Sequence, residues 1–212
     1  MKTPLVLAAI VLALGFALPA RAELSAWEVL NHTLALQDAV QDYTAQCSMV
    51  ANIPGMDIPE RHFKVYYKRP DKVKIESNET VFVPREALTM GGLRRHLQQD
   101  TVVTLAGVGK IGEEKLYCIK LRPNSGSDAS RVLVWIRSGN WTPTRTEIWK
   151  GKTRLFELEW AFGLVADRYW MPQSVLARIP SGILNDQGPG EVRLTWESYT
   201  VNTGLSDDIF TQ

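Results

Sequence analysis

The feature that most constrains the fold is a series of short segments in which apolar and polar residues alternate. Clusters of Gly, Asn, Asp, Pro and Ser separate these segments at intervals of about ten residues. Alternation is typical of a β-strand with one buried face, because successive side chains of a strand point to opposite sides. We predict strands over 44–53, 62–68, 72–77, 116–122, 131–137, 144–150, 153–162, 169–179 and 191–201. This regular spacing indicates a meandering antiparallel sheet or barrel and not a βαβ fold.

Helical patterns precede and interrupt these strands. Ser25 and Glu28 have the spacing of a capping box, and apolar residues follow at helical intervals as far as Tyr43. Residues 84–100 break the strand rhythm and predict one helix or two short helical pieces, in which Gly91-Gly92 is either a hinge or a surface turn. The chain therefore has a sheet with one apolar face and helices available to cover it.

The first 22 residues predict a cleavable export signal. Lys2 precedes an apolar run from residue 5 to 18, and Ala20-Arg21-Ala22 then supplies small residues at the two positions that a signal peptidase reads. The alternative, a retained transmembrane anchor, would need about 20 apolar residues, which is longer than this run. We expect cleavage after Ala22, export to the periplasm, and one domain over residues 23–212.

Composition and motifs exclude several classes of function. Without Lys2 and Arg21 the mature chain has 22 basic and 23 acidic residues, a balance that argues against nucleic acid as a partner. The sequence has no Gly-x-Ser-x-Gly, His-Glu-x-x-His or Cys-x-x-Cys motif. The run from Gly107 to Gly112 is superficially like a dinucleotide loop, but without a βαβ unit around it we interpret it as a hairpin loop. We expect no catalytic residues, no metal, no cofactor and no enzymatic activity.

Two further groups of residues each allow two interpretations. Cys47 and Cys118 could form one disulfide in an oxidising compartment, or remain two buried thiols on different strands. Lys68, Arg69 and Lys72 could dock an anionic headgroup or an acidic partner, or could form the solvated outer face of a two-stranded ribbon.

An apolar face supplies the candidate ligand site. In the segment 153–162 the residues at every second position are apolar, and Glu157 and Glu159 point the other way. Such a face either lines a cavity or packs in a closed core. The candidate lining residues are Phe156, Leu158, Trp160, Phe162, Val134, Ile136, Leu36 and Val40.

The order of these elements resembles the periplasmic outer-membrane lipoprotein-carrier and lipoprotein-sorting superfamily of Gram-negative bacteria. The likeness lies in the helix and strand of 24–53, in residues 63–74 with their Lys68-Arg69-Pro70 turn, in 116–123 followed by 132–136, and in Trp170-Met171-Pro172 with the closing residues 205–210. Residues 78–100 depart from it, since they lack the Asp-Gly turn that the carriers have there. The resemblance implies a mainly β (α+β) fold: a curved, incomplete antiparallel barrel covered by helices, with acyl chains held between.

The resemblance also implies a function. The leading hypothesis is a periplasmic, non-enzymatic carrier for a lipid or a lipid-modified protein, in outer-membrane lipoprotein sorting or envelope lipid transport. The expected partners are acyl chains, with inner- or outer-membrane proteins as candidate donors or acceptors, and the expected state is a monomer. Two alternatives remain: an envelope sensor or protein-interaction module with a filled core, and a hydrolase whose site residues are dispersed along the sequence.

Overall fold

The computed structural model describes residues 23–81, 83, 85–88, 93–97, 100–123, 130–183 and 186–211. Within these ranges ten strands form one antiparallel sheet in the order β3-β2-β1-β10-β9-β8-β7-β6-β5-β4. The strands are β1 (Asp42–Asn52), β2 (Arg61–Lys68), β3 (Lys72–Glu76), β4 (Thr101–Ile111), β5 (Glu114–Pro123), β6 (Ser130–Arg137), β7 (Pro143–Lys150), β8 (Thr153–Val165), β9 (Tyr169–Ile179) and β10 (Gly190–Val201). The helical elements are α1 (Ala26–Asp38), α2 (Arg85–Leu88) and the 3₁₀ turns η1 (Leu93–His96) and η2 (Asp207–Phe210).

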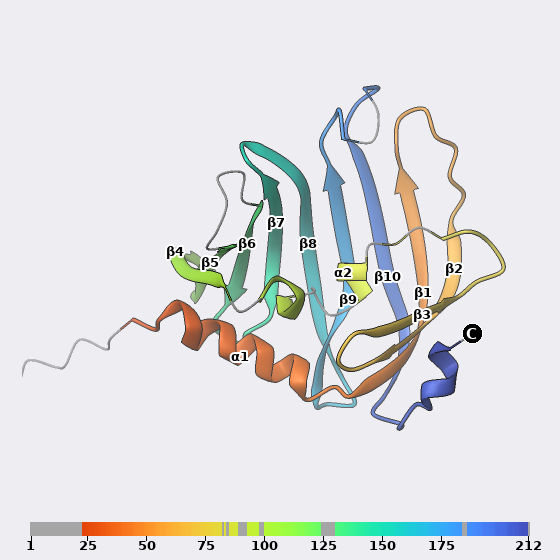
Figure 1. The fold of residues 1–212 in the computed structure, drawn as a ribbon, viewed down its shortest axis with the longest axis horizontal. Coiled ribbons are helices and arrows are strands. Elements are labelled where there is room, and N and C mark those ends of the chain that lie inside the picture. The colour runs from red at the N-terminus through yellow and green to blue at the C-terminus, as the bar shows by residue number, and fades with distance from the viewer. Residues whose placement is uncertain are drawn as a thin grey trace, which may run out of the picture.

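The sheet curves without closing. Figure 1 shows it wrapping partly around α1 and α2, which lie on its concave side. β3 and β4 are the two ends of the strand order and do not pair with each other, so the barrel stays open between them. The predicted fold class, an incomplete antiparallel barrel covered by helices, is confirmed.

α1 begins where the capping box predicts. The Glu28 backbone N–H donates to Ser25 Oγ (3.2 Å), and the Ser25 backbone N–H donates to Glu28 Oε2 (2.7 Å). The buried side of the helix carries Val29, Leu30 and Leu34, which pack on apolar residues of β5 and β6 such as Ile119 and Val134. α1 therefore covers the part of the concave face formed by β4, β5 and β6.

α1 ends earlier than its apolar pattern predicts, at Asp38 and not near Tyr43. Asn202, which follows β10, accepts from the backbone N–H of Gln41 (2.7 Å) and donates to the carbonyl of Ala39 (2.9 Å). These bonds satisfy backbone groups just past the helix end, so the chain can leave the helix there. β1 then starts at Asp42, and Tyr43 enters the core as a strand residue.

The sequence analysis assigned no strand to 101–111, where the structure has β4. Gly107 and Gly109 interrupt the apolar pattern of this strand, and the residues from Ala106 onward are exposed. A glycine-containing edge strand lacks the alternation that marks a half-buried one. The predicted hairpin loop at Gly107–Gly112 is thus mostly strand, and only Gly112, with φ +58°, lies in the turn to β5.

Two predictions concern residues outside the described ranges: the export signal of residues 1–22, and the role of Gly91-Gly92. On either side of Gly91-Gly92 the structure has α2 and η1, in agreement with two short helical pieces.

In the described part of the chain, no helix has both the length and the apolar character that a membrane span requires.

Candidate functional site

A large cavity lies on the concave side of the sheet. Its walls come from β1, β8, β9 and β10, where the inward-facing residues at every second position are apolar. The volume of the cavity is about 620 Å³, within the range of sites that hold small-molecule ligands. Its lining residues are Met49, Ala51, Ile53, Met56, Ile58, Thr80, Val83, Ala87, His96, Ile148, Phe156, Leu158, Val175, Ala177, Ile179, Val192 and Leu194.

The lining is almost wholly apolar. Of the described residues that line the cavity, only Thr80 and His96 have polar side-chain atoms. A ligand would therefore be held mainly by the apolar area removed from water, at roughly 25 cal/mol per Å².

Short helical elements cover part of the cavity. Ala87 of α2 and His96 of η1 contribute to its lining from the side opposite the sheet. α2 is anchored beside the cavity, since the buried Tyr43 hydroxyl donates to the carbonyl oxygen of Leu88 (2.5 Å). Burial raises the pKa of Tyr43 well above its usual value, so this hydroxyl stays a donor at neutral pH.

Bulky side chains close the cavity on the side toward the turn between β8 and β9. Beyond Leu158, Leu194 and Val175, the next inward-facing residues on the same strands are Trp160, Trp196 and Met171, and all three are buried. We call Trp160, Trp196 and Met171 the floor of the cavity. The Trp160 indole N–H donates to Thr146 Oγ1 (3.2 Å), which fixes the ring on β7.

The residues predicted to line a cavity fall into separate groups. Phe156 and Leu158 lie along the cavity. Trp160 belongs to the floor, and Phe162 and Leu36 line a crevice of only about 10 Å³ next to α1. The three remaining residues, Val134, Ile136 and Val40, are fully buried in packed clusters. The predicted apolar face is therefore divided, because α1 and the floor fill the interior beyond Leu158.

Sequence reasoning did not select most of the wall. β1 and β9 contribute Met49, Ala51, Val175, Ala177 and Ile179. The sequence did contain the apolar alternation of these strands. In the predicted strand 191–201, for example, Val192 and Leu194 lie on one apolar face. The strand pairing that brings β1 and β10 together joins residues about 150 positions apart, and alternation alone does not reveal it.

The three candidate docking cations are engaged within the protein. Lys68 and Lys72 both pair with Asp207 of η2 (2.7 and 2.9 Å), and Arg69 pairs with Asp38 at the end of α1 (3.0 Å). Hydrogen bonds from Lys68 and Lys72 lower the pKa of Asp207 to about 2. These cations thus attach η2 and the end of α1 to the β2–β3 hairpin.

The two cysteines are free, which corrects the disulfide alternative. Cys47 lies on β1 and Cys118 on β5, and five strands separate β1 from β5 in the sheet. Neighbouring strands are about 4.8 Å apart, so the two thiols lie far beyond the reach of a disulfide. Burial raises the pKa of both thiols, that of Cys47 to about 12.

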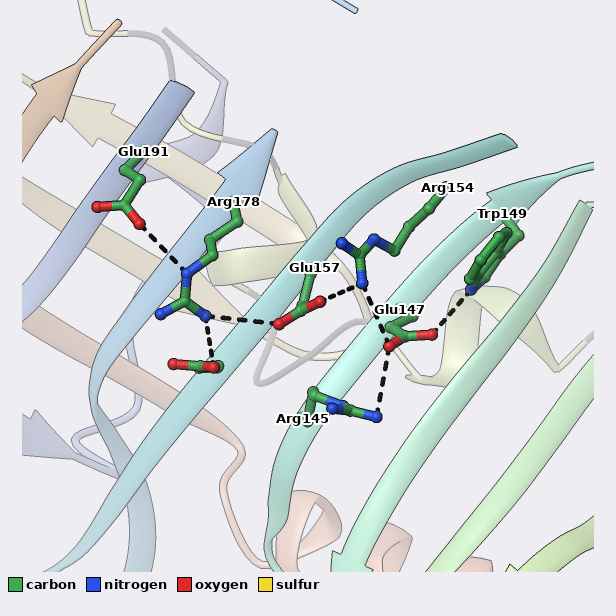
Figure 2. Close-up of polar contacts among 8 residues, drawn as sticks. Arg145, Glu147, Trp149, Arg154, Glu157, Arg178 and Glu191 are labelled. Carbon is green, nitrogen blue, oxygen red and sulfur yellow. Dashed lines mark hydrogen bonds and ion pairs between the residues drawn. The ribbon is translucent and has the colours of Figure 1, made fainter. Parts of the chain in front are cut away.

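The convex face of the sheet carries a network of charged side chains (Figure 2). Arg178 of β9 pairs with Glu191 of β10 (3.2 Å) and with Glu157 and Glu159 of β8. On the same face, Arg154 contacts Glu157 and Glu147, and the indole N–H of Trp149 donates to Glu147 (2.9 Å). These ion pairs link β7, β8, β9 and β10, while the apolar cavity lies on the opposite face.

The fold, but not the sequence, is similar to known proteins. No protein-family model matches the sequence, and no curated protein matches it. A LolA superfamily protein from Nitrosomonas europaea is 14% identical with a TM-score of 0.66, and the match covers 90% of this chain and 99% of that one.

Two further solved structures have the same fold. A domain named as an outer membrane lipoprotein-sorting protein, from Vibrio parahaemolyticus, is 13% identical over 87% of this chain and 95% of its own, with a TM-score of 0.62. A DUF1329 family protein from Desulfovibrio piger is 16% identical over 87% of this chain and 96% of its own, with a TM-score of 0.60. The chain thus has the fold of these three solved proteins, which is the fold expected from the order of its sequence elements.

Proposed function

We propose that this protein is an exported, non-enzymatic carrier that binds the acyl part of a lipid or a lipid-modified protein. The observation that carries the proposal is the apolar cavity of about 620 Å³ between the sheet and its helical cover. The alternative, an interaction module with a filled core, would have close-packed side chains in place of this space. The name of the Vibrio domain, which refers to lipoprotein sorting, supports the same class of ligand.

The chemistry of the cavity supports binding without catalysis. Thr80 and His96 are the polar side chains among its described lining residues, and the carboxylates of the charged network lie on the other face. The Cys47 thiol, with a pKa of about 12, is protonated at neutral pH and is a poor nucleophile. The predicted signal in residues 1–22 supports the periplasm as the place of action.

The direct test is native mass spectrometry and lipid extraction of protein purified from the envelope fraction. We expect an apolar ligand to accompany the wild type. Ala51→Asp places a carboxylate in the cavity wall, where it would have to be desolvated against the ligand, and should abolish co-purification.

The matched control is Ala161→Asp, because Ala161 is exposed on β8 and does not line the cavity. This variant should retain the ligand. A wild type without ligand, or equal retention by the two variants, would refute the carrier proposal and leave the interaction module as the better one.

A further inference from the structure

The size of the cavity limits what it can hold. An apolar cavity of about 150 Å³ accommodates one benzene ring, which corresponds to about 25 Å³ for each carbon atom. On that scale the cavity of about 620 Å³ holds about 25 carbon atoms. One long acyl chain fits within this limit, whereas a lipid with two or three long chains exceeds it.

The floor sets where a chain must stop. Met49, Leu194, Val175 and Trp160 are direct neighbours across β1, β10, β9 and β8, so they form one row across the sheet. Met49, Leu194 and Val175 line the cavity, and Trp160 ends the row as part of the floor. The Trp160 ring is buried and its N–H is hydrogen-bonded to Thr146, so a change of rotamer would lose both that hydrogen bond and the packing of the ring.

From these observations we infer that the cavity binds a single acyl chain and that its floor sets the greatest chain length. The inference rests on the proposed carrier function and specifies its ligand class. The two polar lining side chains, Thr80 and His96, offer few hydrogen bonds to a headgroup, so affinity depends on the number of methylene groups buried. Each methylene contributes about 0.8 kcal/mol, which is about fourfold in Kd.

The experiment measures Kd for saturated fatty acids from about 14 to about 30 carbon atoms, a range on both sides of the capacity of about 25, by displacement of a fluorescent fatty acid. For the wild type, Kd should fall about fourfold for each added methylene and then stop falling near the capacity of the cavity. In native mass spectrometry, a phospholipid with two long chains should bind at least tenfold more weakly than the lysophospholipid with one of them.

A cavity-filling variant tests the length limit. Ala177→Phe adds a ring to the wall and removes the space of about six carbon atoms, so the break in the series should move to chains about six carbons shorter. Ala51→Phe, on β1, makes the same test should Ala177→Phe fail to fold. Ser174→Phe is the control, since Ser174 lies on β9 but does not line the cavity, and it should leave the break in place.

The outcomes separate this inference from the proposed function. Equal binding of one-chain and two-chain lipids, or an unchanged break in both cavity-filling variants, would overturn the single-chain inference while the carrier function stands. Failure of the wild type to bind any acyl chain would overturn both.

Discussion

Truncation of Phe156 and of Trp160 should have opposite consequences for stability and binding, although both residues lie on the same face of β8. Trp160 is 7% exposed and packs against Phe162, whereas Phe156 is only half-buried and borders the cavity. In the floor, the tryptophan has neighbours on every side. At the wall, part of the phenylalanine already faces empty space.

These surroundings set the magnitudes. Trp160→Ala should cost about 3 to 5 kcal/mol for the lost side chain and the void it leaves. The Thr146 hydroxyl loses its hydrogen-bond partner as well, which adds about 1 kcal/mol. Phe156→Ala should cost less than about 2 kcal/mol, because no new void forms on its cavity side.

Urea unfolding measures both changes, provided that the slope m stays constant. Trp160→Ala should lose several kcal/mol out of a total of about 5 to 15 kcal/mol, while Phe156→Ala stays close to wild type and binds an acyl probe more weakly. Equal losses of stability in the two variants would refute the division of this face into wall and floor.

Three further predictions rest on individual side chains in the structure, and one rests on the sequence. Asp42→Ala should lower the free energy of unfolding by about 1.5 to 3 kcal/mol in urea titrations, because the carboxylate accepts from the backbone N–H groups of Thr203 (2.8 Å) and Gly204 (2.9 Å). The pKa of Asp207 is lowered to about 2, so its contribution to the free energy of unfolding is present above the unfolded pKa of about 3.9 and is lost as pH falls toward 2. Asp207→Asn should reduce the slope of the free energy of unfolding against pH between about 4 and 2. Burial raises the pKa of Cys47 to about 12, so the unfolded chain loses this proton at a lower pH than the folded protein; the free energy of unfolding should therefore fall as pH rises above about 8.5. A thiol reagent should label the half-buried Cys118 before the buried Cys47, which mass mapping would show. N-terminal sequencing of the protein from the envelope should return Glu23, and Met1 would contradict the predicted signal.

The strands and the first helix could be predicted from the sequence because their signals are local. Alternation depends only on neighbouring residues, and it located every strand except β4 with bounds within three residues of the observed ones. The capping box of Ser25 and Glu28 likewise joins residues three positions apart. β4 was missed because an exposed edge strand with two glycines has no buried face to pattern.

The features that needed the tertiary structure all depend on residues distant in sequence. α1 ends at Asp38 because Asn202 supplies hydrogen bonds there, and the cations at Lys68 and Lys72 are engaged because Asp207 reaches them from the C-terminal segment. Most decisively, alternation shows which residues face inward but not whether the space before them is filled. Phe156 and Trp160 have the same pattern in the sequence, and only the packing of α1 and the neighbouring strands leaves one beside a cavity and buries the other.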